Sequence, residues 1–241
     1  MSPALSPVPG RWTIVALGDS VVSGPRCGCA PFVDRYAALV TRRTGHQTTV
    51  RNLGVGGSTS TDLLAALQPG GAEAAGLAGA DIVTVTIGAN AMGSARSEWQ
   101  NGTCPGCVDR VAARVERNLS AIVRQVRVDA GRRPLEILVT TYWNVFEEPT
   151  VPGGDDPRTA AYVTMADRAT SRANTAICAA TAREQAACLD LYRPFKGDGS
   201  ADASPLLAAD LDHPSPEGHQ VIASTLADYG WRELGVSTPA R

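Results

Sequence analysis

Apolar and polar positions alternate along the chain in blocks that are typical of buried strands and amphipathic helices. Short apolar runs rich in β-branched residues predict strands at residues 12–17, 48–53, 81–87, 135–142 and 188–192. Four of these runs are mainly apolar and contain at most one charged residue each. That pattern is typical of parallel strands covered on both faces.

Helical patterns fill the intervals between the strands. Helices are expected at residues 31–44, 62–67, 108–130 and 158–185, and a last one from residue 216 or 217 to about 234. Polar loops are expected at 21–30, 93–107, 147–157 and 194–209. Because strands alternate with helices and parallel crossovers are right-handed, the pattern predicts an α/β fold: a three-layer α/β/α sandwich with a five-stranded parallel sheet.

Length and charge narrow the class of protein. The chain has 241 residues and a formal net charge of -2. We expect one domain over residues 11–235, a flexible lead-in over 1–10 and a tail over 236–241. The charge argues against a nucleic-acid partner or an anionic membrane surface. No apolar run approaches the ~18–20 residues of a membrane span, and the first residues lack the features of a signal peptide.

The cysteines fall in three local pairs, which are Cys27 and Cys29, Cys104 and Cys107, and Cys178 and Cys188. This arrangement favours a disulfide within each pair and an oxidising compartment, so we expect a secreted or cell-envelope protein, with a cytoplasmic one left open. Three alternatives stay open: a zinc site built from the CGC and CPGC thiolates, free thiols, and a bond from the first pair to the 104–107 loop. The first pair is tighter than the CxxC of a zinc ribbon, which argues against the metal.

Four polar stretches follow predicted strands or precede the last helix, and parallel strands bring such stretches to one edge of a sheet. They are residues 18–20, 56–58, 88–90 and 210–213. Ser20 is the candidate nucleophile, His213 the base that takes its proton, and Asp210 the carboxylate that holds the imidazole. Together these residue types predict acyl transfer without a metal or cofactor.

Acyl transfer also needs hydrogen-bond donors where negative charge develops. The candidates for this oxyanion hole are the backbone N–H groups of Ser20 and Gly57 and the side-chain amide of Asn90. Gly56 is the alternative to Gly57, because the two glycines are adjacent.

Three aromatic residues are candidates for lining a substrate pocket: Tyr142 and Trp143 at the end of the fourth strand, and Trp99 in a polar loop. Packing in the core is an equal alternative for them. Asp19 and Asn52 are expected to support the site through hydrogen bonds. We expect His219 to have a structural role and Asp212 to have no role in the chemistry.

These motifs resemble those of the SGNH, or GDSL, hydrolase family. The chain contains GDS at residues 18–20, Gly57 within NLGVGGSTS, GxN at 88–90 and DxxH at 210–213, in the family's order. It departs from the family at Ala91, where members often have Asp, and at Val21. The resemblance implies a flavodoxin-like sandwich with strand order 2-1-3-4-5 and ester hydrolysis without a cofactor. The loop cysteines further resemble those of secreted actinobacterial members.

The sequence therefore predicts a serine ester hydrolase acting on carboxylic esters of short to medium acyl chains through a Ser20 acyl-enzyme. An acyltransferase or a carbohydrate deacetylase with the same triad is the first alternative. A non-catalytic flavodoxin-like binding domain is the second. The expected partner is a small-molecule, lipid or glycan ester, and the expected oligomeric state is a monomer.

Overall fold

The computed structural model describes residues 10–24, 27–131, 133–144, 146 and 157–236. Within them, the strands form one sheet in the order β2-β1-β3-β4-β5, and every pairing is parallel. The strands are β1 (Arg11–Gly18), β2 (Gln47–Gly54), β3 (Ile82–Thr86), β4 (Glu136–Thr140) and β5 (Ala187–Leu189). This topology confirms the predicted parallel sheet and its strand order.

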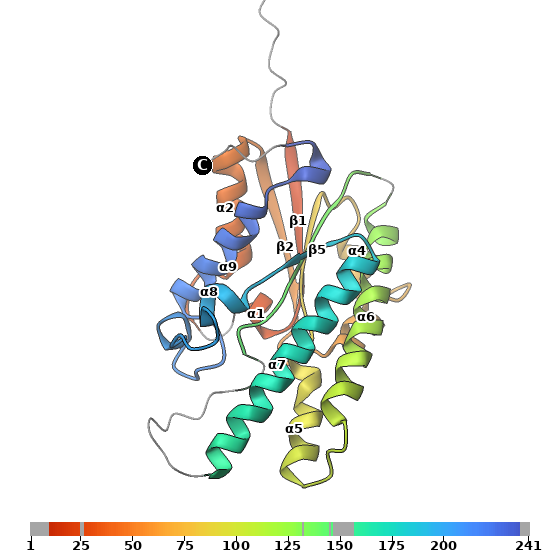
Figure 1. Ribbon diagram of the computed structural model, residues 1–241. Coiled ribbons are helices and arrows are strands. Elements are labelled where there is room, and N and C mark those ends of the chain that lie inside the picture. Colours follow the sequence, from red (N-terminus) through yellow and green to blue (C-terminus); the bar gives the residue numbers. More distant parts are fainter. Residues whose placement is uncertain (1–9, 25–26, 132, 145, 147–156, 237–241) are drawn as a thin grey trace, which may run out of the picture.

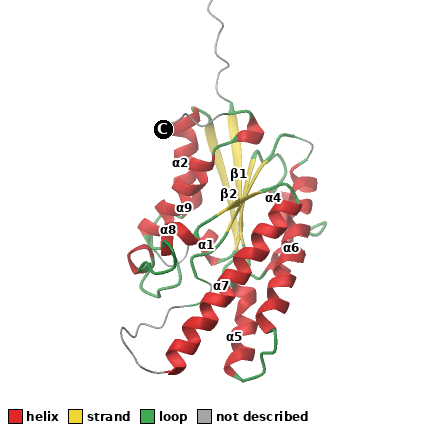
Figure 2. Cartoon of the chain, in the orientation of Figure 1, coloured by secondary structure: helices red, strands yellow, loops and turns green. Residues whose placement is uncertain are grey.

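Helices cover both faces of the sheet, which makes the three predicted layers (Figures 1 and 2). One face carries α2 (Phe32–Thr44) and α9 (Pro216–Tyr229), which pack on each other, and the other carries α6 (Cys107–Ala130) and α7 (Pro157–Arg183). The shorter helices are α1 (Ser20–Ser23), α3 (Ser60–Ala66), α4 (Ala72–Gly76), α5 (Gly93–Gln100) and α8 (Tyr192–Lys196). Single 3₁₀ turns are η1 (Asn90–Met92), η2 (Ser204–Leu206) and η3 (Arg232–Leu234).

The continuous apolar runs form the centre of the sheet. Every residue of β3 and of β4 is buried, because helices cover both faces of these strands. The edge strand β2 is half-exposed and correspondingly more polar. Since all strands run the same way, their carboxyl ends meet at the lower edge of the sheet in Figure 1, where α1 begins.

Several expectations about local structure are wrong. Residues 21–30 were expected as a loop, yet α1 continues to Ser23, and the loop expected at 194–209 contains the end of α8 and the turn η2. Residues 93–107 were expected as a loop, yet α5 occupies Gly93–Gln100. The fifth strand is shorter than residues 188–192, because Tyr192 already begins α8. The last helix ends at Tyr229, where Gly230 takes a positive φ of 90° that a continuing helix does not permit.

Three disulfides join the cysteines of each local pair. The Cys27–Cys29 bond lies between α1 and α2, and the Cys104–Cys107 bond precedes the body of α6. The third bond ties Cys178 of α7 to Cys188 of β5. The six sulfur atoms are therefore bonded in three pairs, and none of them is a free thiolate that could bind zinc. No helix in the described ranges is both long enough and apolar enough to cross a membrane.

Candidate active site

The end of β1 places Ser20 at the carboxyl edge of the sheet. Gly18 has a φ of 148°, and a Cβ atom there would collide with the carbonyl oxygen of Thr86 on β3, so only glycine fits. The next residue, Asp19, donates its backbone N–H to the same carbonyl at 3.2 Å. Its carboxylate caps α1 by accepting the backbone N–H of Val21 at 3.0 Å. Ser20 is thus the first residue of a capped helical turn.

A tight turn before α9 brings Asp210 and His213 side by side. Oδ1 of Asp210 accepts the backbone N–H groups of Asp212, at 3.2 Å, and His213, at 3.0 Å. Leu211 between them has a φ of 56°, a left-handed conformation that costs a non-glycine residue about 1–2 kcal/mol. The hydrogen bonds of the turn hold this strained residue in place.

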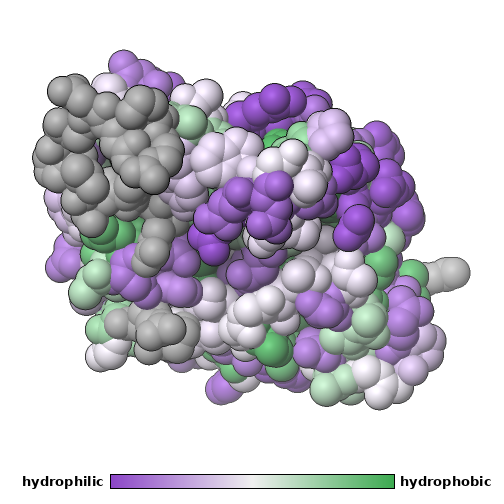
Figure 3. All heavy atoms as spheres, turned by 90° about the horizontal axis from the view of Figure 1, so that it is seen from below, coloured by the Kyte–Doolittle hydropathy of each residue, from purple (hydrophilic) through white to green (hydrophobic). Residues whose placement is uncertain are grey.

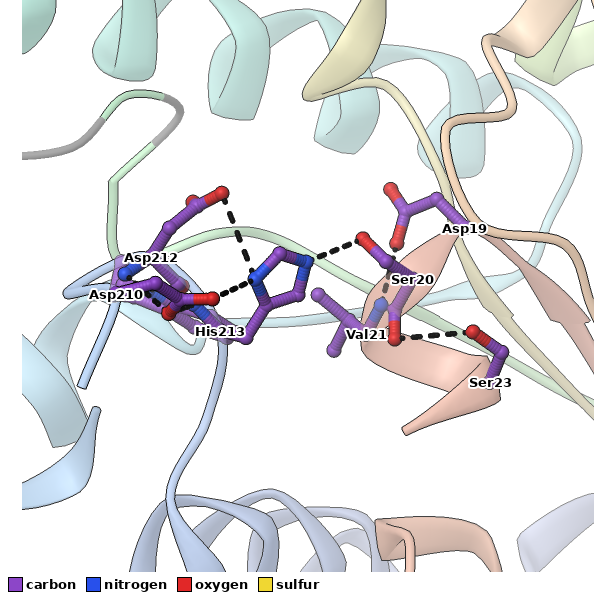
Figure 4. A network of polar contacts seen from close by, with 8 residues as sticks. Asp19, Ser20, Val21, Ser23, Asp210, Asp212 and His213 are labelled. Carbon is purple, nitrogen blue, oxygen red and sulfur yellow. Dashed lines mark hydrogen bonds and ion pairs between the residues drawn. The ribbon is translucent and has the colours of Figure 1, made fainter. Parts of the chain in front are cut away.

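The structure brings the three predicted triad residues into one line of hydrogen bonds (Figure 4). Nε2 of His213 lies 2.8 Å from Oγ of Ser20, and Nδ1 lies 2.8 Å from Oδ2 of Asp210. When Nδ1 donates its proton to Asp210, Nε2 carries the lone pair that accepts the Ser20 hydroxyl. A second carboxylate is close, since Oδ2 of Asp212 lies 3.8 Å from Nδ1.

The electrostatics of the turn keep Asp210 ionised. Partial burial acts to raise its pKa, but hydrogen bonds from the backbone N–H and ring of His213 and from the N–H of Asp212 outweigh it. The pKa of Asp210 therefore lies below its ordinary value. An ionised carboxylate at this place could stabilise a protonated imidazole at His213.

The predicted oxyanion donors lie on three neighbouring loops. The side chain of Asn90, just after β3, donates to the backbone carbonyl of Ser58 at 3.0 Å and so connects its loop to the one after β2. Gly57 precedes Ser58 and has a φ of 80°, with open space where a Cβ would lie. The positive φ, and not crowding, therefore favours glycine here. Among the described residues, the backbone N–H groups of Ser20 and Gly57 have no hydrogen-bond acceptor.

A small cavity of about 40 Å³ lies beside Ser20 and His213. Its walls include Asn90 and two predicted lining residues, Tyr142 and Trp143. Both aromatic side chains are almost entirely buried, at 1% and 2% exposure. They line the cavity and also belong to the hydrophobic core.

Both aromatic residues also hold parts of the site in place. The indole N–H of Trp143 donates to the backbone carbonyl of Asp212 at 3.2 Å, and its ring stacks on Phe195 with centroids 4.3 Å apart. The hydroxyl of Tyr142 donates to Oδ2 of Asp19 at 2.5 Å. None of these three contacts follows from the sequence, because each joins residues far apart in the chain.

The third predicted lining residue, Trp99, lies in a different cavity. That cavity has a volume of about 200 Å³ and lies between α5, α6 and α7, against the Cys104–Cys107 disulfide. Trp99 meets Tyr162 edge to face there, with ring centroids 6.1 Å apart. It does not line the small cavity at Ser20.

Asp19 and Asn52 make the supporting hydrogen bonds expected of them. Asp19 is 1% exposed, and burial raises its pKa to about 6 despite the hydrogen bonds from Tyr142 and Val21. The side-chain amide of Asn52 donates to the backbone carbonyl of Val22 at 2.8 Å and holds the other end of α1.

One group of potential metal ligands occurs among the described residues. Donor atoms of Cys27, Cys29 and the buried His219 lie within 4.8 Å of one another. The two sulfur atoms are bonded to each other. Nδ1 of His219 accepts the backbone N–H of Phe32 at 3.1 Å, so the neutral ring carries its proton on Nε2. The group therefore does not match a metal's ligand set, and His219 has the structural role expected for it.

The fold is a three-layer α/β/α sandwich whose candidate site residues lie at the carboxyl edge of a parallel sheet. The model of the GDSL-like lipase/acylhydrolase family matches residues 16–221, and the chain belongs to this family. It is a carboxylic ester hydrolase, and the non-catalytic alternative is not retained.

Solved structures share the fold. A lipase from a goat rumen metagenome is 19% identical with a TM-score of 0.74, covering 91% of this chain and 98% of that one. Axe2, an acetylxylan esterase from Geobacillus stearothermophilus, is 17% identical with a TM-score of 0.64, covering 98% of this chain and 100% of that one. TesA is 18% identical with a TM-score of 0.56, covering 92% and 97%. A comparison with curated protein sequences finds no match.

Proposed function

We propose that this chain is a serine esterase that cleaves esters of short acyl chains through a covalent intermediate on Ser20. The observation that carries the proposal is the hydrogen-bonded line from Ser20 through His213 to Asp210, with 2.8 Å at each link. A serine hydroxyl is a weak nucleophile until a neighbouring base takes its proton. His213 is placed for that role, and Asp210 fixes its tautomer.

The reaction then follows in two steps. Oγ of Ser20 bonds to the ester carbonyl carbon while its proton passes to Nε2 of His213, and the carbonyl oxygen becomes an oxyanion. The N–H groups of Ser20 and Gly57 and the amide of Asn90 are its donors. Collapse of this intermediate breaks the bond to the alcohol oxygen, which takes the proton from His213. Water repeats the sequence, releases the acid and restores Ser20.

The size of the cavity favours a short acyl group. Its volume of about 40 Å³ suits an acetyl group better than a long acyl chain. The face of the molecule in Figure 3 carries hydrophilic residues over much of its visible area, with hydrophobic residues in small, separate patches. A water-soluble ester fits this surface better than a lipid aggregate does.

A carbohydrate deacetylase is the second candidate, because the small cavity fits an acetyl group whatever alcohol carries it. The resemblance in fold to an acetylxylan esterase is consistent with that reaction but carries no evidence about the alcohol. Acetylated oligosaccharides and simple alkyl acetates, compared as substrates at equal concentration, distinguish the two. Addition of an acceptor alcohol tests the transferase alternative, since a transferase forms a new ester and not acetate.

The three disulfides support our inference that the protein works in an oxidising compartment. A single catalytic domain over residues 11–235 and a monomeric state stay predictions.

Two measurements test the proposed function. A fluorophosphonate should label Ser20 in the wild-type protein and should not label Ser20→Ala, with mass spectrometry locating the modified peptide. A series of nitrophenyl esters from acetate to palmitate should give the highest kcat/KM at the shortest chains. A label on another residue contradicts the assignment of the nucleophile, and a preference for long chains contradicts the assignment of the acyl group.

A further inference from the structure

Asp19 is a buried carboxylate beside the nucleophile that the two-step reaction does not use. It is 1% exposed, and no described lysine or arginine forms an ion pair with it. Removing a carboxylate from water costs free energy unless hydrogen bonds replace its hydration. Here Oδ1 accepts the N–H of Val21 at 3.0 Å, and Oδ2 accepts the hydroxyl of Tyr142 at 2.5 Å.

Tyr142 is itself held by α7, independently of Asp19. Its backbone N–H donates to Oδ1 of Asn174 at 2.9 Å, and the side-chain amide of Asn174 donates to its backbone carbonyl at 2.8 Å. This reciprocal pair fixes the segment after β4 against a long helix. The phenol of Tyr142 is therefore a fixed donor toward which the carboxylate of Asp19 is drawn.

The nucleophile lies on α1, a helix of only four residues (Ser20–Ser23), which is too short to be stable by itself. Side-chain hydrogen bonds fix it from both ends. Asp19 binds its first turn through the N–H of Val21, and Asn52 of β2 binds the carbonyl of Val22 at 2.8 Å. The position of Ser20 therefore depends on contacts outside its own helix.

We propose that Asp19 and Tyr142 form a positioning pair that orients Ser20 and its backbone N–H for attack, and that does so only while Asp19 is ionised. An ionised carboxylate accepts both hydrogen bonds at once. A protonated one must use one oxygen as a donor, and the contact with Tyr142 or with Val21 then reverses or breaks. This inference rests on the proposed role of Ser20 as the nucleophile.

The surroundings of Asp19 place its pKa in a pH range where enzyme activity can be measured. Burial raises its pKa to about 6, the hydrogen bonds from Tyr142 and Val21 lower it, the carboxylate of Asp212 raises it, and His213 lowers it. As pH falls through this value, Asp19 takes up a proton and the pair is lost. The acid side of the activity profile therefore contains a titration that belongs to Asp19.

The experiment compares pH profiles of kcat/KM for three variants with that of the wild-type protein. Tyr142→Phe removes the hydroxyl that lowers the pKa of Asp19, so an acid-side inflection should move to higher pH. Its kcat on the plateau should fall roughly tenfold to a hundredfold with little change in KM, because the nucleophile is misplaced. Asp19→Asn removes the titrating group, so the acid-side inflection that moves in Tyr142→Phe should disappear.

Asn52→Ser is the matched control, because it loosens the opposite end of α1 without removing a titratable group. It should lower kcat and leave the shape of the pH profile unchanged. If Tyr142→Phe gives the wild-type profile, or if Asp19→Asn keeps the inflection assigned to Asp19, the positioning pair is wrong. Should Asp19→Asn fail to fold, the Tyr142→Phe profile decides by itself.

Labelling by a fluorophosphonate separates this inference from the proposed function. If the wild-type protein is not labelled at Ser20, the proposed function fails. The other outcome is that the wild-type protein is labelled at Ser20, and that Tyr142→Phe and Asp19→Asn are labelled at the wild-type rate over the whole pH range. In that case only the positioning pair fails.

Discussion

Oδ2 of Asp210 lies 2.8 Å from Nδ1 of His213, within a turn whose backbone N–H groups are bonded to the other oxygen of the same carboxylate. One side chain thus shapes the turn and orients the imidazole. The second carboxylate near this nitrogen, Asp212, is 3.8 Å away and 47% exposed. Distance and exposure both indicate that the two aspartates are not interchangeable.

We therefore expect different effects from removing each charge. Asp210→Asn should lower kcat by about 10²–10⁴, because the amide does not favour the required tautomer or stabilise the imidazolium. Asp212→Asn, the matched control in the same turn, should lower kcat by less than about tenfold, since water screens an exposed charge. Steady-state kinetics on nitrophenyl acetate measure both. Equal losses in the two variants would contradict the assignment of Asp210.

Asn90 provides a test of the oxyanion hole. Asn90→Ala should lower kcat by roughly 10²–10³ with a smaller change in KM, because the amide binds a charge that develops only in the transition state. Asn101→Ala, at the far end of α5, removes an exposed asparagine of the same size and should leave kcat unchanged. A loss confined to KM in Asn90→Ala would mean that the amide binds the ground state.

The sequence was sufficient to predict the sheet and to predict that the candidate site residues lie close together. Continuous apolar runs such as residues 82–86 permit few other structures, and their common direction places the residues that follow them at one edge. Ser20 and Asn90 each follow such a run directly. Their neighbourhood therefore follows from topology, without knowledge of any side-chain contact.

The supporting contacts could not be predicted in the same way. The hydrogen bond between Tyr142 and Asp19 joins residues 123 positions apart. Its donor, Tyr142, has no feature in the sequence that distinguishes it from the other residues at the end of the fourth strand. The helix α5 was missed because Gly93–Gln100 is mostly polar and begins at a glycine. Only Ala95 is buried within it. Such features depend on tertiary packing, which a local pattern does not contain.

The pH dependence of stability should contain a contribution from His219. Burial, followed by the charges of Arg35 and His213, lowers the pKa of His219 to about 4. An unfolded histidine titrates near pH 6.5, so between these values the unfolded state binds more protons. The contribution of His219 to the free energy of unfolding is therefore complete above about pH 6.5 and falls as pH decreases toward 4. The raised pKa of Asp19 acts in the opposite direction below about pH 6.

The variant His219→Asn isolates this contribution, because its Oδ1 can still accept the N–H of Phe32 but it does not titrate. Urea unfolding at pH 7 and at pH 5 gives the change in the free energy of unfolding for each protein. The decrease on going to pH 5 should be about 2 kcal/mol smaller in the variant than in the wild-type protein. Identical decreases would show that His219 is not the titrating group.

The disulfide between Cys178 and Cys188 should contribute more to stability than the other two, because it closes the longest loop. Its cysteines are 10 positions apart, against 2 and 3 in the other pairs. Loop-closure entropy predicts that replacing both cysteines with alanine lowers the free energy of unfolding by about 2.5–3 kcal/mol.

The same double replacement of Cys27 and Cys29 is the control and should cost about 1–2 kcal/mol. Urea unfolding of the oxidised proteins measures both effects, and full reduction should remove most of the difference between wild type and variants. Thiol titration of the denatured, unreduced protein must first find no free thiols. Free thiols at this stage, or a larger loss from the CGC pair, would contradict the argument from loop length.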